Sequence, residues 1–228
     1  PQSMQALPQD AEETERAFEE IRLELGPETR VAQVEEIFFV ATDDTEESFE
    51  RSKETVSAVT RHLYGRYFEK KPERPIRVYL FRDKDGYDAY CRKAYARPPS
   101  TPYGFYVPGE RKTVMNIATG QGTLAHELVH PLLNEDFPAA PTWFNEGFAS
   151  LLEQSRTRNG EMTGLVNWRL PGLRKALEDR EPATLAGLLA TSSKDFSGPS
   201  RGTHYAAARY LCMFLQERGE LIPFYKSF

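Results

Sequence analysis

Residues 122–153 read GTLAHELVHPLLNEDFPAAPTWFNEGFASLLE, and this segment constrains the fold more than any other part of the chain. Its apolar residues recur three and four positions apart on both sides of a proline-rich stretch, which predicts two helices. Pro131, Pro138 and Pro141 are expected to end the first helix, turn the chain and start the second, with Thr142 as N-cap. The segment therefore predicts two neighbouring antiparallel helices.

The first of these helices carries two of the chain's four histidines, four positions apart. Residues at this spacing share one face of an α-helix, so His126 and His130 can direct two imidazole nitrogens at one metal ion. Glu127 projects beside that ion, where its carboxylate can take a proton from water. A catalytic zinc needs a third protein ligand, and Glu146 on the second helix is the obvious candidate. The pattern indicates a divided Zn²⁺ site.

Neighbouring residues of the two helices carry weaker expectations. Gly147 follows Glu146, and its missing side chain would let the helix approach the metal closely. Ser150, one turn later, would hydrogen-bond a ligand side chain. Glu135 and Glu153 are interpreted as ordinary solvated charges.

The chain before residue 122 predicts a strand-rich half that also contains helices. Period-2 alternation and β-forming residues mark the strands, and apolar residues at helical spacing mark the helices. The elements expected there are a helix over 10–25 with Asp10 as N-cap, a strand in VEEIFFVATDD, a helix over about 46–69, a strand in IRVYLFRD, a short helix in KDGYDAYCRKAYA, and two strands in GFYVPGERKTVMNIAT joined at Pro108 and Gly109, with Gly109 in the turn.

Helices dominate the rest of the chain. Beyond the two described above, they are expected near residues 171–180, 183–190 and 204–218. Strands followed by helices are typical of an α+β fold. We expect one domain over residues 1–228, with a strand-rich half to about residue 121 and a helical half over about 122–228.

Charge and hydropathy indicate which classes of partner the chain is expected to lack. The formal net charge of −5 is mild and the basic residues are interleaved with acids, so a nucleic-acid partner is not expected. No apolar run reaches the length of a membrane span. The start at Pro1 does not look natural, so the compartment stays open, and secreted or periplasmic protein with a signal removed is one reading.

The chain has two cysteines, Cys91 and Cys212, and a further histidine, His62, in its strand-rich half. The two cysteines fall in what read as separate helices and form no CxxC pair, so two buried thiols are expected. One long-range disulfide is the alternative if the protein is exported. His62, on a long charged helix, is interpreted as a surface residue.

HELVH followed by PTWFNEGFASLLE resembles the gluzincin metallopeptidases, in particular the peptidase MA-like group related to thermolysin and the zinc aminopeptidases. The resemblance is specific over residues 113–153 and loose elsewhere. It implies zinc held by His126, His130 and Glu146, with Glu127 as the general base for a metal-activated water. It also implies a thermolysin-like zincin domain, in which a mixed sheet with an exposed edge strand precedes the HExxH helix, the Glu helix and a helical second half.

The same resemblance suggests how a substrate would be held. KTVMNIA, residues 112–118, would be the edge strand along which an extended peptide pairs, although an ordinary hairpin strand is equally consistent. Related enzymes stabilise the oxyanion with a Tyr or His of the helical half, and GTHYAAARYLCMFL offers Tyr205 first and His204 second. Simple packing of Tyr205 beside Tyr210 is the competing explanation. No segment that grips a free N-terminus is recognised, so endopeptidase-like activity is expected.

Three functions of different classes follow from these patterns. The leading hypothesis is a zinc-dependent peptide hydrolase that acts on a peptide or protein substrate. The second is a catalytically weak or inactive zincin-fold module that binds zinc and a protein partner. The third is a metal-free structural domain. Substrate, cleavage preference and oligomeric state are not encoded in any motif of the chain.

Overall fold

The protein is described by a computed structural model that covers residues 11–179 and 184–228. Within these residues the strands form a five-stranded mixed sheet in the order β1-β2-β3-β5-β4 and a separate two-stranded hairpin, β6-β7. In the sheet β2, β3 and β5 run parallel, whereas β1 and β4 pair antiparallel with their neighbours. The strands are β1 Arg30–Val34, β2 Phe38–Thr42, β3 Ile76–Phe81, β4 Gly104–Val107, β5 Lys112–Asn116, β6 Ser155–Arg158 and β7 Glu161–Gly164.

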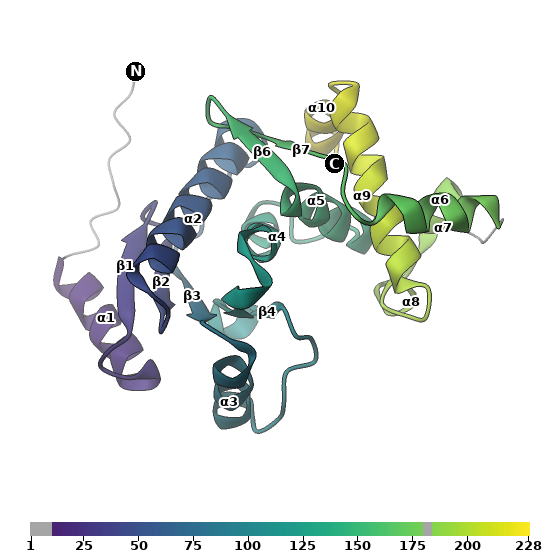
Figure 1. Ribbon diagram of the computed structural model, residues 1–228. Helices are drawn as coiled ribbons and strands as arrows, with labels where there is room; N and C mark the ends of the chain where they lie inside the picture. The colour runs from purple at the N-terminus through teal and green to yellow at the C-terminus, as the bar shows by residue number, and fades with distance from the viewer. Residues whose placement is uncertain (1–10, 180–183) are drawn as a thin grey trace, which may run out of the picture.

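Helices cover both faces of the sheet and build the second half of the chain. Figure 1 shows α4 between the sheet-containing half and the group of helices that follows it. The helices of the described residues are α1 Ala11–Leu25, α2 Glu46–Arg66, α3 Lys84–Tyr95, α4 Gln121–Asp136, α5 Thr142–Glu153, α6 Leu170–Glu178, α7 Leu185–Ala190, α8 Ser193–Phe196, α9 Arg201–Glu217 and α10 Leu221–Lys226. The α+β class with a mixed sheet is confirmed. The predicted N-cap Asp10 lies outside the described residues.

The sheet is buried on both faces because its strands alternate between two apolar clusters. Val78 and Leu80 of β3 belong to the larger cluster with α2, α4 and α5, whereas Tyr79 and Phe81 pack with α1 and α3. The predicted strand in IRVYLFRD is therefore buried on both faces and does not expose one face to solvent. The larger cluster continues into α5 and α9, so the two halves share one core.

The predicted strand in VEEIFFVATDD is confirmed as β2, whereas β1, which precedes it, was not predicted. β1 and β2 form a hairpin whose turn holds Glu35 at φ 53° and Glu36 at φ 58°. Glutamate is an uncommon residue at positive φ, so the sequence carried no ordinary turn signal there. At the tip between β4 and β5, Gly109 lies in the turn as expected, and Arg111 at φ 51° takes the left-handed conformation.

The edge of the sheet beside α4 is β4 and not β5. β5 lies between β3 and β4, so KTVMNIA is an interior strand and the expectation of an edge strand there is wrong. Within residues 11–179 and 184–228, β4 has one strand neighbour, which is β5. The sequence could not decide this, because both strands of a hairpin have the same length and pattern, and the order depends on which one joins β3.

Two expectations about the helix junction also fail. Pro131 does not end α4, because the helix continues through it to Asp136. Proline has no backbone N–H, so the helical hydrogen bond to the carbonyl of residue 127 is missing there. Thr142 is the first residue of α5 rather than its N-cap, and its hydroxyl lies 2.6 Å from that of Ser193. Pro141 is the N-cap. The turn between the helices is consequently short.

Both cysteines are buried and free, as expected for two thiols without a partner. Cys91 lies in α3 on one side of the sheet and Cys212 in α9 in the other core cluster. Burial raises the pKa of the Cys91 thiol to about 11 and raises that of Cys212 as well. Neither is a reactive thiolate at neutral pH. In the described parts of the chain, no helix has the length and apolar character needed to cross a membrane.

His62 is buried, so the expectation of a surface histidine is wrong. It is 4% exposed in α2, and its Nδ1 accepts the backbone N–H of Met162 at 3.1 Å, which ties the β6-β7 hairpin to α2. Burial, helped by the charge of Arg66, lowers the pKa of His62 to about 4. Because α2 is long and charged, its sequence pattern concealed this inward position.

Acid should therefore weaken the fold through His62. In the unfolded state His62 takes up a proton near pH 6.5, whereas in the folded state it does so only near pH 4. The contribution of neutral His62 to the free energy of unfolding is therefore fully present above pH 6.5 and is lost as the pH falls toward 4. We expect a loss of about 2 kcal/mol between pH 6.5 and 5 in the metal-free protein. Urea unfolding of wild type and His62→Gln measures it, since glutamine keeps an acceptor but does not titrate. Equal pH slopes for the two proteins would contradict this expectation.

Candidate metal centre

Three side chains from two adjacent helices converge in the buried region between α4 and α5. His126 and His130 come from one face of α4, and Glu146 comes from the first turn and a half of α5. Glu146 Oε2 lies 3.4 Å from His126 Nε2 and 3.9 Å from His130 Nε2. The three donor atoms lie within 4.8 Å of one another. Tetrahedral zinc separates its ligand atoms by ~3.3 to 3.5 Å, so the observed spacing suits one ion.

The chemistry of Glu146 also fits a metal ion. Its Oε2 is buried and has no hydrogen-bond partner among the described residues. Burial raises the pKa of Glu146, but the charge of His130 and the contact with His126 lower it more, to about 2. The group is therefore a buried carboxylate anion whose oxygen faces two imidazole nitrogens. Such an oxygen needs a cation or a donor, because an uncompensated buried charge is strongly unfavourable.

The second nitrogen of each histidine has a different environment. His130 Nδ1 lies 2.8 Å from Asn145 Oδ1, so an N–H at Nδ1 donates to the amide oxygen and leaves the Nε2 lone pair free for a metal. His126 Nδ1 is buried, with no partner in the part of the chain that the structure describes. Asn145 was not among the predicted site residues. Its only sequence signal was its place directly before Glu146.

Glu127 is buried beside the three donors. Burial lowers the pKa of His126, but contact with Glu146 and the charges of Glu146 and Glu127 raise it above its ordinary value. The Glu127 charge acts also on Tyr87 of α3 and on Tyr205 of α9. The Glu127 carboxylate is therefore close enough to His126 and to both tyrosines for its charge to act on them.

The two residues predicted as oxyanion donors both have their rings against Phe196 but differ in their polar contacts. Tyr205 of α9 interacts through its hydroxyl with the Glu146 carboxylate, and burial followed by the Glu146 charge raises the pKa of Tyr205. His204 stacks its ring on that of Phe196, and its Nδ1 lies 3.3 Å from the Phe196 carbonyl oxygen. The structure brings Tyr205 to the candidate metal centre, whereas His204 contacts Phe196 of α8.

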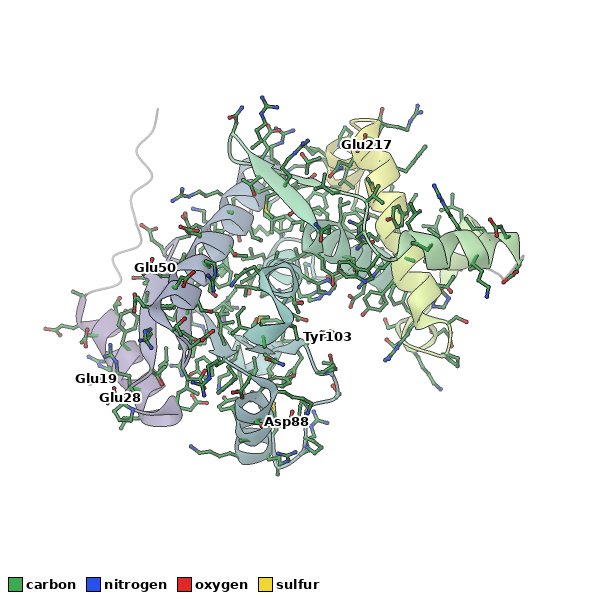
Figure 2. All side chains as sticks on the ribbon, viewed as in Figure 1. Glu19, Glu28, Glu50, Asp88, Tyr103 and Glu217 are labelled. Atoms are coloured by element: carbon green, nitrogen blue, oxygen red, sulfur yellow. The ribbon has the colours of Figure 1, made fainter. Side chains whose placement is uncertain are left out.

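Gly147 allows α5 to approach another group closely, but that group is α9 and not the expected metal ion. A Cβ at Gly147 would lie 2.7 Å from the backbone oxygen of Ala208 in α9. The missing side chain therefore lets α9, which carries Tyr205, pack against α5, which carries Glu146. Figure 2 shows the side chains of these helices and of α4 filling the space between them.

The other expectations for α5 are corrected. Ser150 is fully buried, but its hydroxyl has no hydrogen-bond partner among the residues described, so it does not support a ligand directly. Glu153 is not a solvated charge, because it lies 3.1 Å from Arg169 Nη2 and is largely buried. Glu135 on α4 likewise pairs with Arg111 in a partly buried position.

No protein-family model matches the chain, and a comparison with curated proteins finds no similar sequence. The site is therefore characterised by its own geometry. Two imidazole nitrogens and one carboxylate oxygen form a donor set typical of transition-metal ions, and zinc with three protein ligands leaves a position open for substrate or water. His126, His130 and Glu146 are the residues that would hold the ion.

Proposed function

We propose that this protein is a zinc-dependent peptide hydrolase, endopeptidase-like, with a thermolysin-like zincin arrangement and gluzincin ligands. The observation that carries the proposal is the convergence of His126, His130 and Glu146, with Glu127 beside them. The order of a mixed sheet, the HExxH helix, the Glu helix and further helices supports it. Zinc bound to this donor set would supply Lewis acidity for a peptide carbonyl and for a water molecule.

Glu127 is the proton carrier of the proposed reaction. Its carboxylate takes a proton from the attacking water and delivers it to the nitrogen of the leaving amine, which has to be protonated before it departs. A buried position favours this role because bulk water does not compete for the proton. His126 and His130 need only hold the ion, and Asn145 keeps His130 in the tautomer that does so.

Tyr205 is the proposed donor to the oxygen that becomes negatively charged. Its raised pKa keeps the phenol protonated, so its O–H is available as a hydrogen-bond donor near neutral pH. The interaction with Glu146 places this hydroxyl at the metal ligands. In the proposed reaction this O–H turns from the Glu146 carboxylate to the oxygen on which charge develops.

The free side of β4 is the proposed track for an extended substrate. Among the described residues β4, Gly104–Val107, pairs only with β5, so the N–H and C=O groups on its other side can bond a peptide added as a further strand. β4 packs near α4, the helix that carries two of the ligands. Backbone pairing there would hold a peptide beside the site regardless of its sequence.

Metal content and peptide cleavage test the proposal together. Protein purified without chelators should contain about one equivalent of zinc and cleave a proteome-derived peptide library read by mass spectrometry. Chelation should stop cleavage, and added zinc should restore it. Less than about half an equivalent of metal would count against any zinc function. Full zinc without zinc-dependent cleavage would favour a non-catalytic binding module.

The same digest tests Tyr205 against its neighbour. Tyr205→Phe removes only the hydroxyl and should slow cleavage by roughly 10²–10³-fold, the usual loss for one oxyanion donor. His204→Gln is the matched variant and should cleave at a rate close to wild type, because His204 contacts Phe196. A Tyr205→Phe protein as fast as His204→Gln would remove Tyr205 from the mechanism.

A further inference from the structure

Residues 165–169 connect β7 to α6 and present an exposed aromatic ring. Trp168 is 61% exposed and Val166 is 58% exposed, whereas Asn167 between them is buried. The chain's other tryptophan, Trp143, is buried in the core. A single exposed apolar residue is ordinary on a protein surface, so exposure alone says little. Two further features distinguish Trp168 from other exposed apolar residues: hydrogen bonds from α9 hold its loop, and the loop lies next to the candidate metal centre.

The loop is held rigidly by buried polar groups of α9. Arg209 is fully buried, and its guanidinium donates to the backbone carbonyl oxygens of Ser150, at 3.0 Å, and of Leu165. The Tyr210 hydroxyl accepts the Asn167 N–H at 3.1 Å. Burial of a guanidinium is costly unless its donors are satisfied, and one of its hydrogen bonds, to Leu165, anchors this connection, while another ties α9 to α5 at Ser150. The exposed ring is therefore presented on a fixed backbone.

The loop lies next to the candidate metal centre. The Arg169 guanidinium carbon is 5.1 Å from the centre of the Trp168 ring and 5.9 Å from the centre of the Tyr205 ring. Tyr205 in turn interacts with Glu146, one of the three ligands. One guanidinium group thus separates the exposed ring from the proposed oxyanion donor.

The charge of Arg169 is already compensated. Its Nη2 lies 3.1 Å from the Glu153 carboxylate, and both side chains are largely buried. An acidic substrate group would have to compete with this ion pair. What the loop offers to a ligand is therefore the apolar surface of Trp168 and Val166, and this favours an apolar partner over an anionic one.

We propose that Trp168 determines specificity, and that its ring receives a large apolar side chain of the substrate next to the bond that is cleaved. The inference rests on the proposed hydrolase function and names the substrate class for the same site. Tyr205 and Glu127 act on the peptide bond, whereas Trp168 contacts only the side chain. Its removal should change which peptides bind and leave the metal in place.

Two hydroxamic acids test this preference without relying on turnover. A hydroxamate binds zinc directly, so N-acetyl-phenylalanine hydroxamate and N-acetyl-glycine hydroxamate differ only in the side chain beside the metal-binding group. The zinc-loaded wild type should bind the phenylalanine compound about tenfold or more tighter, because its phenyl ring would leave water for the exposed apolar surface of Trp168 and Val166. Trp168→Ala should reduce this preference to about twofold, and Trp168→Phe should keep most of it. Calorimetry measures each affinity.

Phe214→Ala is the matched control. Phe214 is 57% exposed on α9 and carries Arg218 over its ring at 5.5 Å, so it resembles Trp168 in exposure and in its cationic neighbour. It should leave the preference unchanged. Acrylamide quenching gives an independent measurement, because Trp168 is the exposed tryptophan, and the phenylalanine compound should protect it more than the glycine compound does.

The outcomes separate the two proposals. If both hydroxamates bind equally, or if Trp168→Ala retains the wild-type preference, the role of Trp168 is wrong while the zinc site stands. If neither hydroxamate binds the zinc-loaded protein, the proposed hydrolase site fails and the inference fails with it. Loss of the preference in both Trp168→Ala and Phe214→Ala would also overturn a specific role for Trp168.

Discussion

Glu127→Gln should lower the rate of peptide cleavage by roughly 10²–10⁴-fold and leave the zinc content unchanged. Glutamine has nearly the same size and shape as glutamate but does not accept a proton at neutral pH. The ligands His126, His130 and Glu146 are untouched, so the metal should stay bound. Initial rates on one library-derived peptide, with zinc measured in the same samples, give both quantities.

Glu135→Gln is the control for this variant because it makes the same chemical change on the same helix. Glu135 pairs with Arg111 and takes no part in the proposed reaction, so only a small stability change is expected. Its cleavage rate should match the wild type. The general-base role would be wrong if Glu127→Gln cleaved as fast as Glu135→Gln with equal zinc bound.

His130→Ala should abolish zinc binding at micromolar metal and, with it, all cleavage. Two remaining ligands hold zinc weakly, and Glu146 would be left as a buried carboxylate with fewer compensating partners. Zinc binding stabilises only the folded state, so added zinc should raise the Tm of the wild type but not of His130→Ala. Thermal unfolding with and without zinc measures the difference.

Asn145→Ala is expected to have a zinc affinity between those of the wild type and His130→Ala. It removes the acceptor at 2.8 Å from His130 Nδ1 but keeps every ligand, so zinc affinity should fall by about 10- to 100-fold rather than disappear. A His130→Ala protein that binds zinc as tightly as Asn145→Ala would show that His130 is not a ligand. The order wild type, Asn145→Ala, His130→Ala in zinc affinity is the expected result.

The convergence of His126, His130 and Glu146 could be predicted from sequence because their geometry is mostly local. An i,i+4 pair on a helix fixes the relation of His126 to His130 whatever the rest of the fold does. Glu146 could be added because only a short turn separates its helix from theirs. The major helices and β3 were also predictable, since their apolar periodicity is strong over many residues.

The remaining features depend on contacts between distant segments. The position of β4 at the sheet edge is decided by the pairing of β5 with β3, more than thirty residues earlier in the chain. The buried state of His62 depends on the backbone of Met162, and the role of Arg209 depends on carbonyl groups of two other segments. No local pattern records such partners. Glu35 and Glu36 were missed for a different reason, since glutamate seldom adopts positive φ.

The absent Cβ of Gly147 has a consequence for the whole centre. It fixes the distance between the helix that holds a metal ligand and the helix that holds both Tyr205 and Arg209. Arg209 in turn positions the connection that carries Trp168. Glu146, Tyr205 and Trp168, the proposed ligand, oxyanion donor and substrate-contacting ring, therefore all depend on how closely α5 and α9 approach each other. That spacing rests on the contact of Gly147 with Ala208 and on the Arg209 bond to Ser150, both of which lie outside the proposed reacting atoms.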